Sequence, residues 1–278
     1  MLRNCLFLAS SLLAATVVWA QQVAPTQPPA ASAPAVRTES QKLASDKLME
    51  MAKFLSRQEK FSATLRVGYE VPQANGQKIE FGEIRDLAVQ RPNRVRMSEQ
   101  ASDGRGNIMV FDGKTITLLD GETGKYAQVP QPGDIDHTVV YYIRDLKMRL
   151  PLAPLLMAHF PEEMQSRIES VDYVERTTIL GEPAHHIAAR TANIDFQVWI
   201  VDGKRPLPLR IVLNYRNEAG HPQFWVQFSK WNLAPQFAKS TFEFKAPKGA
   251  EQILFAVQVP RLAESTQAAA TQPQGDKQ

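Results

Sequence analysis

Few side chains in this sequence are grouped in a way that could support catalysis. The sequence contains no nucleophile-elbow motif, phosphate-binding loop, dinucleotide fingerprint or His-Glu-x-x-His zinc motif. Asp134, Asp136 and His137 could together bind a metal ion, but acidic residues also favour helix starts, where they cap free backbone N–H groups. We favour the capping interpretation, so we expect no catalytic residue, no cofactor and no metal. A hydrolase that uses Asp136 and His137 is the enzymatic alternative.

The other histidines are interpreted as structural. His185 and His186 are adjacent on an expected strand, so they point to opposite faces of a sheet and cannot bind one metal ion together. His159 lies on the apolar face of an expected helix, where it would be a core residue or a residue at the edge of a lid.

Three arginines, Arg91, Arg94 and Arg96, surround a proline-containing turn between two expected strands. Arg94 and Arg96 share one face of the outgoing strand, where they are typical of a solvated outer face that protects a sheet edge. Arg91 lies in the turn itself, on the rim of the sheet. From there it could reach an element that covers the sheet.

The N-terminal region indicates export. Residues 1–20 contain a short apolar run followed by small residues before Gln21, which is typical of a signal peptide. The run is shorter than the roughly 20 apolar residues of a spanning helix, so we expect no membrane span after cleavage. Residues 21–40 are expected to be a disordered Pro/Ala-rich linker, 41–258 the folded domain, and 259–278 a disordered tail.

The charge balance and cysteine count exclude some functions. The formal net charge is +3, too small to predict nucleic acid binding. The one cysteine, Cys5, lies within the expected signal peptide, so the mature protein would have no disulfide and no thiolate site.

The elements that must position these residues follow from hydrophobic spacing. Leu43, Leu48, Met51 and Leu55 recur at helical spacing, with Ser45 or Asp46 as the expected cap. Residues 61–71 then alternate apolar and polar side chains, which predicts a strand with one buried face. Short turns separate the strands that follow, so they are expected to form an antiparallel meander.

The strand pattern is interrupted between about residues 133 and 170. Leu152, Leu155, Leu156, His159 and Phe160 share one helical face, and alternating strands resume after this insertion. The fold class is therefore α+β: one large curved antiparallel sheet, a half-barrel of about 11 strands, covered by an N-terminal helix and a mid-chain helical insertion. Such an arrangement would enclose an apolar hollow.

Tryptophans in the late strands lie on the face opposite to their apolar neighbours. Trp199 opposes Val198 and Ile200, and Trp225 likewise opposes the residues beside it. Large apolar groups on both faces indicate either local packing on both sides of the sheet or a binding surface.

Two regions resemble the periplasmic lipoprotein-carrier proteins of the LolA type. The first is VQRPNRVRM followed by IMVFDGKTITLLD, and the second is FWVQFSKWNLAPQFAKSTFEFKAPKGAEQI, which ends in Phe242, Phe244, Pro247 and Gly249. Over about residues 45–254 the chain looks more closely still like an uncharacterised family of predicted periplasmic proteins related to those carriers. The resemblance implies an eleven-stranded half-barrel with a helical lid over a cavity for acyl chains. It also implies that Arg91 hydrogen-bonds to the lid.

We therefore expect a periplasmic binding protein that holds an acyl chain, lipid or other apolar ligand. The candidate lid and ligand residues are Arg91, Leu152, Leu155, Leu156, Phe160, Trp199 and Trp225. The alternative is an interaction or sensor module that binds an envelope protein, membrane protein or lipoprotein without carrying lipid. A filled interior would favour the alternative.

Overall fold

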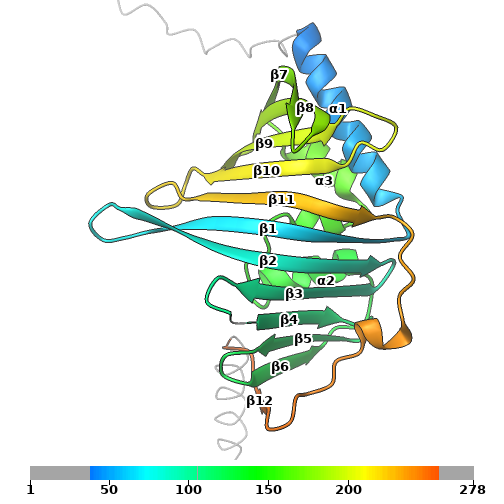
Figure 1. Ribbon diagram of the computed structural model, residues 1–278, viewed down its shortest axis with the longest axis vertical. Coiled ribbons are helices and arrows are strands. Elements are labelled where there is room, and N and C mark those ends of the chain that lie inside the picture. Colours follow the sequence, from blue (N-terminus) through cyan, green and yellow to red (C-terminus); the bar gives the residue numbers. More distant parts are fainter. Residues whose placement is uncertain (1–37, 105, 257–278) are drawn as a thin grey trace, which may run out of the picture. The chain divides into compact units, whose positions relative to one another are not determined.

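The alternating segments of the sequence pair into one long sheet (Figure 1). The computed structural model describes residues 38–104 and 106–256. The expected signal peptide, almost all of the expected linker and the expected tail lie outside the described residues. Within the described part, twelve strands follow the order β12-β6-β5-β4-β3-β2-β1-β11-β10-β9-β8-β7.

The strands are 3 to 13 residues long and are joined mostly by tight turns, as the sequence predicts. Their bounds are β1 (Lys60–Pro72), β2 (Lys78–Gln90), β3 (Arg94–Ala101), β4 (Gly106–Phe111), β5 (Thr115–Asp120), β6 (Lys125–Pro130), β7 (Ser170–Ile179), β8 (Glu182–Arg190), β9 (Ile194–Val201), β10 (Pro208–Tyr215), β11 (Gln223–Asn232) and β12 (Glu251–Ile253). All neighbouring pairs are antiparallel except one, because β12 returns from the end of the chain to pair in parallel with β6. The sequence did not indicate this last strand.

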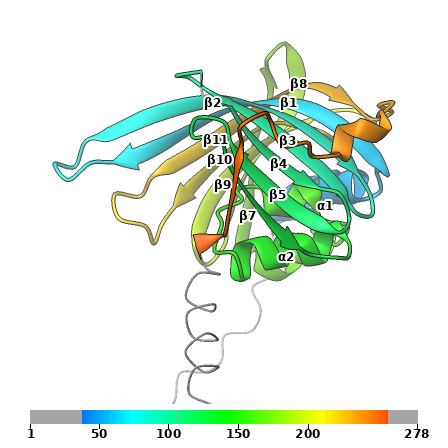
Figure 2. The same cartoon turned by 90° about the horizontal axis from the view of Figure 1, so that it is seen from below.

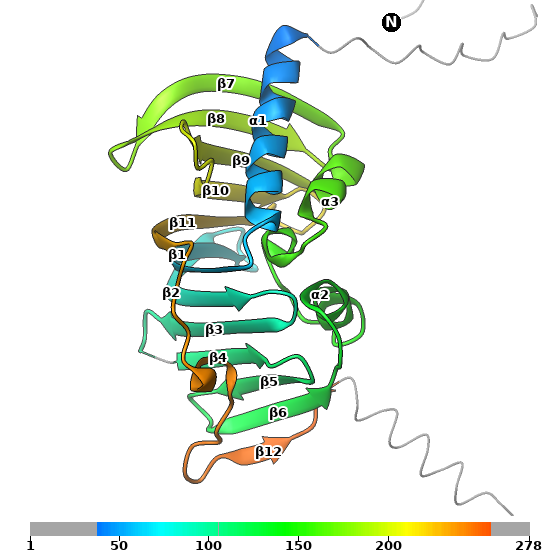
Figure 3. The same cartoon turned by 90° about the vertical axis from the view of Figure 1, so that its right-hand side faces the viewer.

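The α-helices and the first 3₁₀ turn lie on one face of the sheet, the inner face (Figure 3). They are α1 (Glu39–Ser56), α2 (Ile135–Arg144), the 3₁₀ turn η1 (Ala153–Leu156) and α3 (Phe160–Arg167). The sheet curves around them (Figure 2), so the expected curved sheet with an N-terminal helix and a mid-chain helical insertion is confirmed. Helix α1 begins earlier than expected, because Thr38 and Gln41 form a capping box and neither Ser45 nor Asp46 is the cap.

The single helical face expected for residues 152–160 is wrong. The stretch divides into η1 and the start of α3, with an extended Met157 after η1. Pro154 and Pro161 explain the break, because proline has no N–H to donate to the preceding turn and its ring clashes with the carbonyl four residues back. We call residues 145–159, which join α2 to α3, the lid segment.

The outer face of the sheet has its own cover over β3 to β6. After β11 the chain crosses this face, forms the 3₁₀ turn η2 (Lys239–Phe242) and ends in β12 (Figure 3). Phe242 is only 2% exposed and packs edge-on against Phe237, with ring centres 5.1 Å apart. The ring centre of Phe244 lies 5.2 Å from that of Tyr126 on β6. We call residues 233–253 the strap. It buries outer-face residues that strand alternation alone would leave in solvent.

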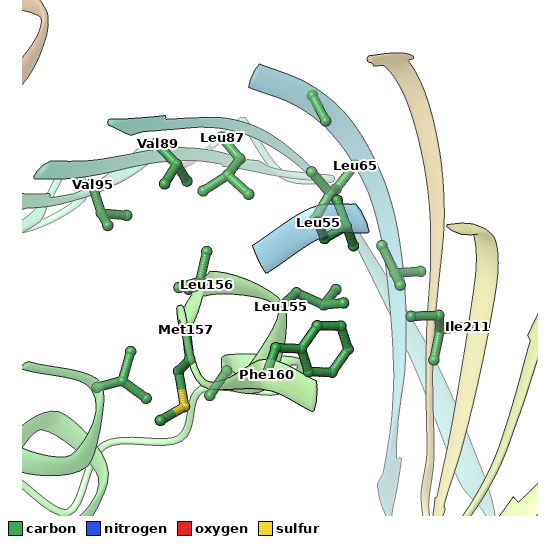
Figure 4. Packing of buried hydrophobic residues seen from close by; sticks show 14 of the residues in the cluster. Leu55, Leu65, Leu87, Val89, Val95, Leu155, Leu156, Met157, Phe160 and Ile211 are labelled. Carbon is green, nitrogen blue, oxygen red and sulfur yellow. The ribbon is translucent and has the colours of Figure 1, made fainter. Parts of the chain in front are cut away.

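The main core lies between the inner face and the helices. Leu48 and Leu55 of α1 meet Phe61, Leu65 and further inner-face residues of the sheet. Figure 4 shows Leu155, Leu156 and Phe160 facing this surface from the lid segment and α3, whereas the Met157 side chain points away from the strands. The lid segment is thus part of the core, and it fills much of the space that the curved sheet leaves.

Candidate ligand-binding site

Arg91 connects the rim of the sheet to the lid segment. The residue lies in the turn between β2 and β3, and its guanidinium donates one hydrogen bond to the backbone carbonyl of Leu156 and another to that of Gln58, the latter at 3.1 Å. The hydrogen bond to the lid that the resemblance implied is therefore present. The guanidinium also lies 5.9 Å from the ring centre of Phe61, within the range of a cation–π interaction.

The Arg91 cation is only partly compensated. Its Nη2 atom is buried and has no hydrogen-bond partner among the described residues. Burial lowers the pKa of Arg91, while the nearby carboxylate of Asp136 acts in the opposite direction. Arg91 is thus a desolvated cation whose one anionic neighbour belongs to α2.

Asp136 also binds the lid segment, just beyond the residue that Arg91 contacts. Its carboxylate accepts hydrogen bonds from the backbone N–H groups of Ala158 and His159, at 2.8 and 3.0 Å, and contacts the His159 ring at 2.6 Å. This contact raises the pKa of His159, whose side chain is largely exposed and is therefore not a core residue. Asp134 caps α2 by accepting from the N–H of His137 at 2.9 Å, which confirms the capping interpretation for this residue.

The centre of the fold beneath these contacts is almost filled. Leu156 and Met157 are buried, and the cavities beside Leu156 have volumes of only about 40 and 20 Å³. No acyl chain fits in such volumes. The hollow expected in the middle of the curved sheet is therefore closed by the lid segment.

A larger pocket lies to one side, between the inner face of β9 and β10, α3 and the lid segment. Its volume is about 580 Å³, within the range of 300–1,000 Å³ that is typical of ligand sites. The walls are mainly apolar, with Phe196, Val198, Ile211 and Leu213 from the strands and Met51 from α1. Charged side chains are confined to a few positions, all on the lid segment, α3 and the turn after β10: Lys147, Arg149, Glu163, Arg167 and Glu218.

The candidate residues divide between this pocket and other places. Leu152, Leu155 and Phe160 line the pocket, whereas Leu156 lines the two small cavities instead. Arg91 does not line it either and contacts the lid segment from the far side of Leu156. The sequence had placed Val198 on the face opposite to Trp199, but it did not indicate that a space remains in front of that face.

Trp199 and Trp225 lie on the outer face and do not line the pocket. The Trp199 ring stacks on His186 with ring centres 4.1 Å apart. Trp225 lies flat over Gly68, where a Cβ atom would come within 2.4 Å of the indole ring, and Arg210 lies 4.9 Å from the ring centre. Both indoles therefore pack on the outer face of the sheet. The expectation that Trp199 and Trp225 contact a ligand in the pocket is wrong.

The two adjacent histidines point to opposite faces, as expected. His186 joins Trp199 on the outer face and contacts Gln197 at 3.0 Å, whereas His185 contacts Tyr173 at 2.9 Å. In the part of the chain that the structure describes, no three His, Cys, Asp or Glu side chains come together as metal ligands.

A charged cluster interrupts the apolar inner face on β2 and β3. Arg85 pairs with Glu83 and lies 3.4 Å from Glu99, so two carboxylates share one guanidinium. Burial raises the pKa of Glu83 to about 7, with Arg85 opposing the shift and Glu99 adding to it. Burial also raises the pKa of Tyr142, on α2, to about 12. These three charged residues were not singled out from the sequence.

The solved structures similar to this chain are distant. An uncharacterised conserved protein from Thermus thermophilus is 12% identical over 76% of this chain and 99% of that one, with a TM-score of 0.46. The structure of the Pseudomonas aeruginosa MucA/MucB complex is 22% identical over 73% of this chain and 61% of that one, with a TM-score of 0.40. A LolA superfamily protein from Nitrosomonas europaea is 11% identical over 72% of this chain and 97% of that one, with a TM-score of 0.36.

The comparison with curated protein sequences gave no match. Among the described helices, none combines the length and apolar character needed to cross a bilayer. Residues 44–256, most of the chain and nearly all of the described part, match a family described as "Predicted periplasmic protein (DUF2092)". The chain therefore belongs to the DUF2092 family of predicted periplasmic proteins, as the sequence resemblance indicated.

Proposed function

We propose that this protein is a periplasmic binding protein that holds an acyl chain or another apolar ligand in the pocket beside β9 and β10. The observation that carries the proposal is the pocket itself: about 580 Å³ of space with mainly apolar walls. Each methylene group that moves from water into such a site contributes roughly 0.8 kcal/mol. Binding needs no catalytic group, so we propose a carrier or sequestering protein rather than an enzyme.

The lid segment would control access to this pocket. Leu152 and Leu155 line the pocket, and the segment is attached to the sheet by Arg91 and to α2 by Asp136. Movement of the segment away from the strands would enlarge the pocket toward the filled centre. We propose that Arg91 acts as a latch because its bond to Leu156 must break in this movement.

The proposed site of action is the periplasm after removal of residues 1–20. An apolar molecule that leaves a membrane needs a protected environment in water, and an exported protein with a covered pocket would supply it. The ligand is proposed to be acyl-bearing or otherwise apolar.

The test is to purify the protein from periplasm and to identify what it carries by native mass spectrometry and lipid extraction. Phe196→Asp would place a charge in the pocket wall, whereas Val174→Asp would place one on an exposed position of edge strand β7. We expect bound lipid on the wild type and on Val174→Asp, but not on Phe196→Asp. Wild-type protein free of lipid, and unable to take up a fluorescent fatty acid, would refute the proposal.

A second candidate function, a module that binds an envelope partner, is supported by one other surface. On the β1–β2 hairpin, Tyr69 pairs with Phe81 and Val71 pairs with Ile79, and all four side chains are at least 36% exposed. An exposed apolar row of this kind is typical of an interaction site. Failure of all lipid assays together with capture of a partner that Phe81→Asp abolishes would favour this function.

A further inference from the structure

The charges at the mouth of the pocket are unequal in number. Lys147, Arg149 and Arg167 are opposed by two carboxylates among the pocket residues. Arg167 pairs with Glu163 at 2.7 Å, and Arg149 binds both carboxylate oxygens of Glu218, at 2.8 and 3.2 Å. Each arginine is thus neutralised locally, and both carboxylates are occupied by an arginine.

Lys147 is the remaining cation. Its side chain is exposed, and no ion pair joins it to another described residue. Two residues along, Arg149 is held firmly because its guanidinium also lies 4.9 Å from the ring centre of Tyr215. The mouth therefore presents one uncompensated positive charge next to an ordered guanidinium.

The backbone at Lys147 is unusual for a lysine. Its φ angle is +56°, in the left-handed region where glycine is preferred, and the N–H of Met148 bonds to the carbonyl of Tyr142 at 3.1 Å. Lys147 lies two residues beyond Asp145, the C-cap of α2, at the point where the chain leaves the helix. Lysine at this position costs conformational free energy, although the C-terminal end of α2 attracts a cation and offsets part of that cost.

We propose that the pocket ligand is an amphiphile with an anionic head group, and that Lys147 binds this head group at the mouth. This inference rests on the proposed function, because it names the ligand class of the same pocket. The apolar tail lies against Phe196, Ile211 and Leu213, and the head group remains at the mouth beside Lys147 and Arg149.

A cationic head group fits this mouth poorly. It would meet the charge of Lys147, and the two carboxylates of Glu163 and Glu218 are already bound to arginines. A neutral head group would form no ion pair with Lys147. The arrangement therefore discriminates by charge, while the apolar wall supplies most of the affinity.

The experiment compares amphiphiles that share a twelve-carbon chain, used below their micelle concentrations. Dodecanoate, dodecyl phosphate, dodecyltrimethylammonium and the neutral dodecanol would each displace a neutral fluorescent apolar probe from the full-length mature protein. We expect both anions to bind about five- to tenfold more tightly than the cation, with a difference that shrinks in 0.5 M salt. The two anions would distinguish a carboxylate from a phosphate preference.

Lys147→Gly is the informative variant. Glycine suits the left-handed backbone, so this protein should fold at least as stably as the wild type while the charge is lost. We expect anion affinity to fall about three- to fivefold and dodecanol affinity to stay unchanged. Lys204→Ala, at an exposed lysine away from the pocket, should change neither.

The outcomes separate the two proposals. Equal affinity for anionic and cationic amphiphiles, or unchanged anion binding by Lys147→Gly, would overturn the head-group inference and leave the apolar pocket in place. If neither the probe nor any amphiphile binds, the proposed function fails and the inference fails with it.

Discussion

Replacement of Arg91 by leucine tests whether the bond to Leu156 controls ligand release. In the closed structure the guanidinium donates to the carbonyls of Leu156 and Gln58. Gln58 precedes β1 and is not part of the lid segment, so only the bond to Leu156 must break when this segment moves away. Arg91→Leu removes that bond and replaces the guanidinium with a shorter, uncharged apolar side chain.

The expected magnitude follows from the strength of one charged hydrogen bond. Such a bond contributes about 1.5–3 kcal/mol. Since about 1.4 kcal/mol corresponds to a factor of ten, ligand should leave Arg91→Leu about ten- to a hundredfold faster than it leaves the wild type. Global stability should change less, by about 1 kcal/mol, because the variant also removes a buried cation with an unpaired Nη2 atom.

The assay is stopped-flow dissociation of a fluorescent fatty acid into excess lipid vesicles, combined with urea denaturation of each protein. Arg94→Leu is the matched control, because Arg94 begins β3 just after the same turn and lies opposite Gln90 of β2 in the strand register. Arg94→Leu should release ligand at the wild-type rate. An unchanged rate for Arg91→Leu, or a rate that follows the loss of stability in unrelated variants, would refute the latch.

Three further variants test the packing and the charges around the site. Gly68→Ala should destabilise the fold by about 1–3 kcal/mol in urea denaturation and alter tryptophan fluorescence, because its Cβ would come within 2.4 Å of Trp225. Gly82→Ala is the control, because the nearest atom to its Cβ is 3.7 Å away, and it should change neither the stability nor the fluorescence. Because burial raises the pKa of Glu83 from 4.5 to about 7, the folded protein holds this proton more tightly than the unfolded chain does. The free energy of unfolding should therefore fall by up to about 3 kcal/mol as pH rises from 4.5 to 7, and denaturation of Glu83→Gln across this range should show a smaller fall. Phe242→Ala should cost about 3–5 kcal/mol in thermal or urea denaturation, because the side chain is 2% exposed; a cost below about 1 kcal/mol would show that the strap is not needed for stability.

The sequence predicted the sheet because strand periodicity is a local property. A period of two decides which side chains share a face, so the inward row of β1 could be assigned from its own residues. The short turns fixed the antiparallel order in the same way. The Arg-Pro-Asn turn could be placed on the rim of the sheet, and its resemblance to a carrier motif indicated the bond from Arg91 to the lid.

Other features depend on contacts between segments that are distant in the sequence. The parallel pairing of β12 with β6 and the bonds of Asp136 to residues 158 and 159 have no local signal. Proline can be read as a helix breaker, yet the helical spacing of Leu152 to Phe160 still suggested one continuous face. Packing of Leu156 into the centre, rather than toward a ligand, was decided by the shape of the surfaces on both sides.

The sequence by itself therefore determined which faces are apolar, and the tertiary structure decided where those faces fail to meet. An unfilled volume is the difference between the curvature of a sheet and the bulk of the elements that cover it. It arises from how α1, α3 and the lid segment pack together, and no single segment encodes it. For this reason the pocket lies beside β9 and β10 and not at the expected centre of the sheet. The charged residues at its mouth could be identified only from the structure.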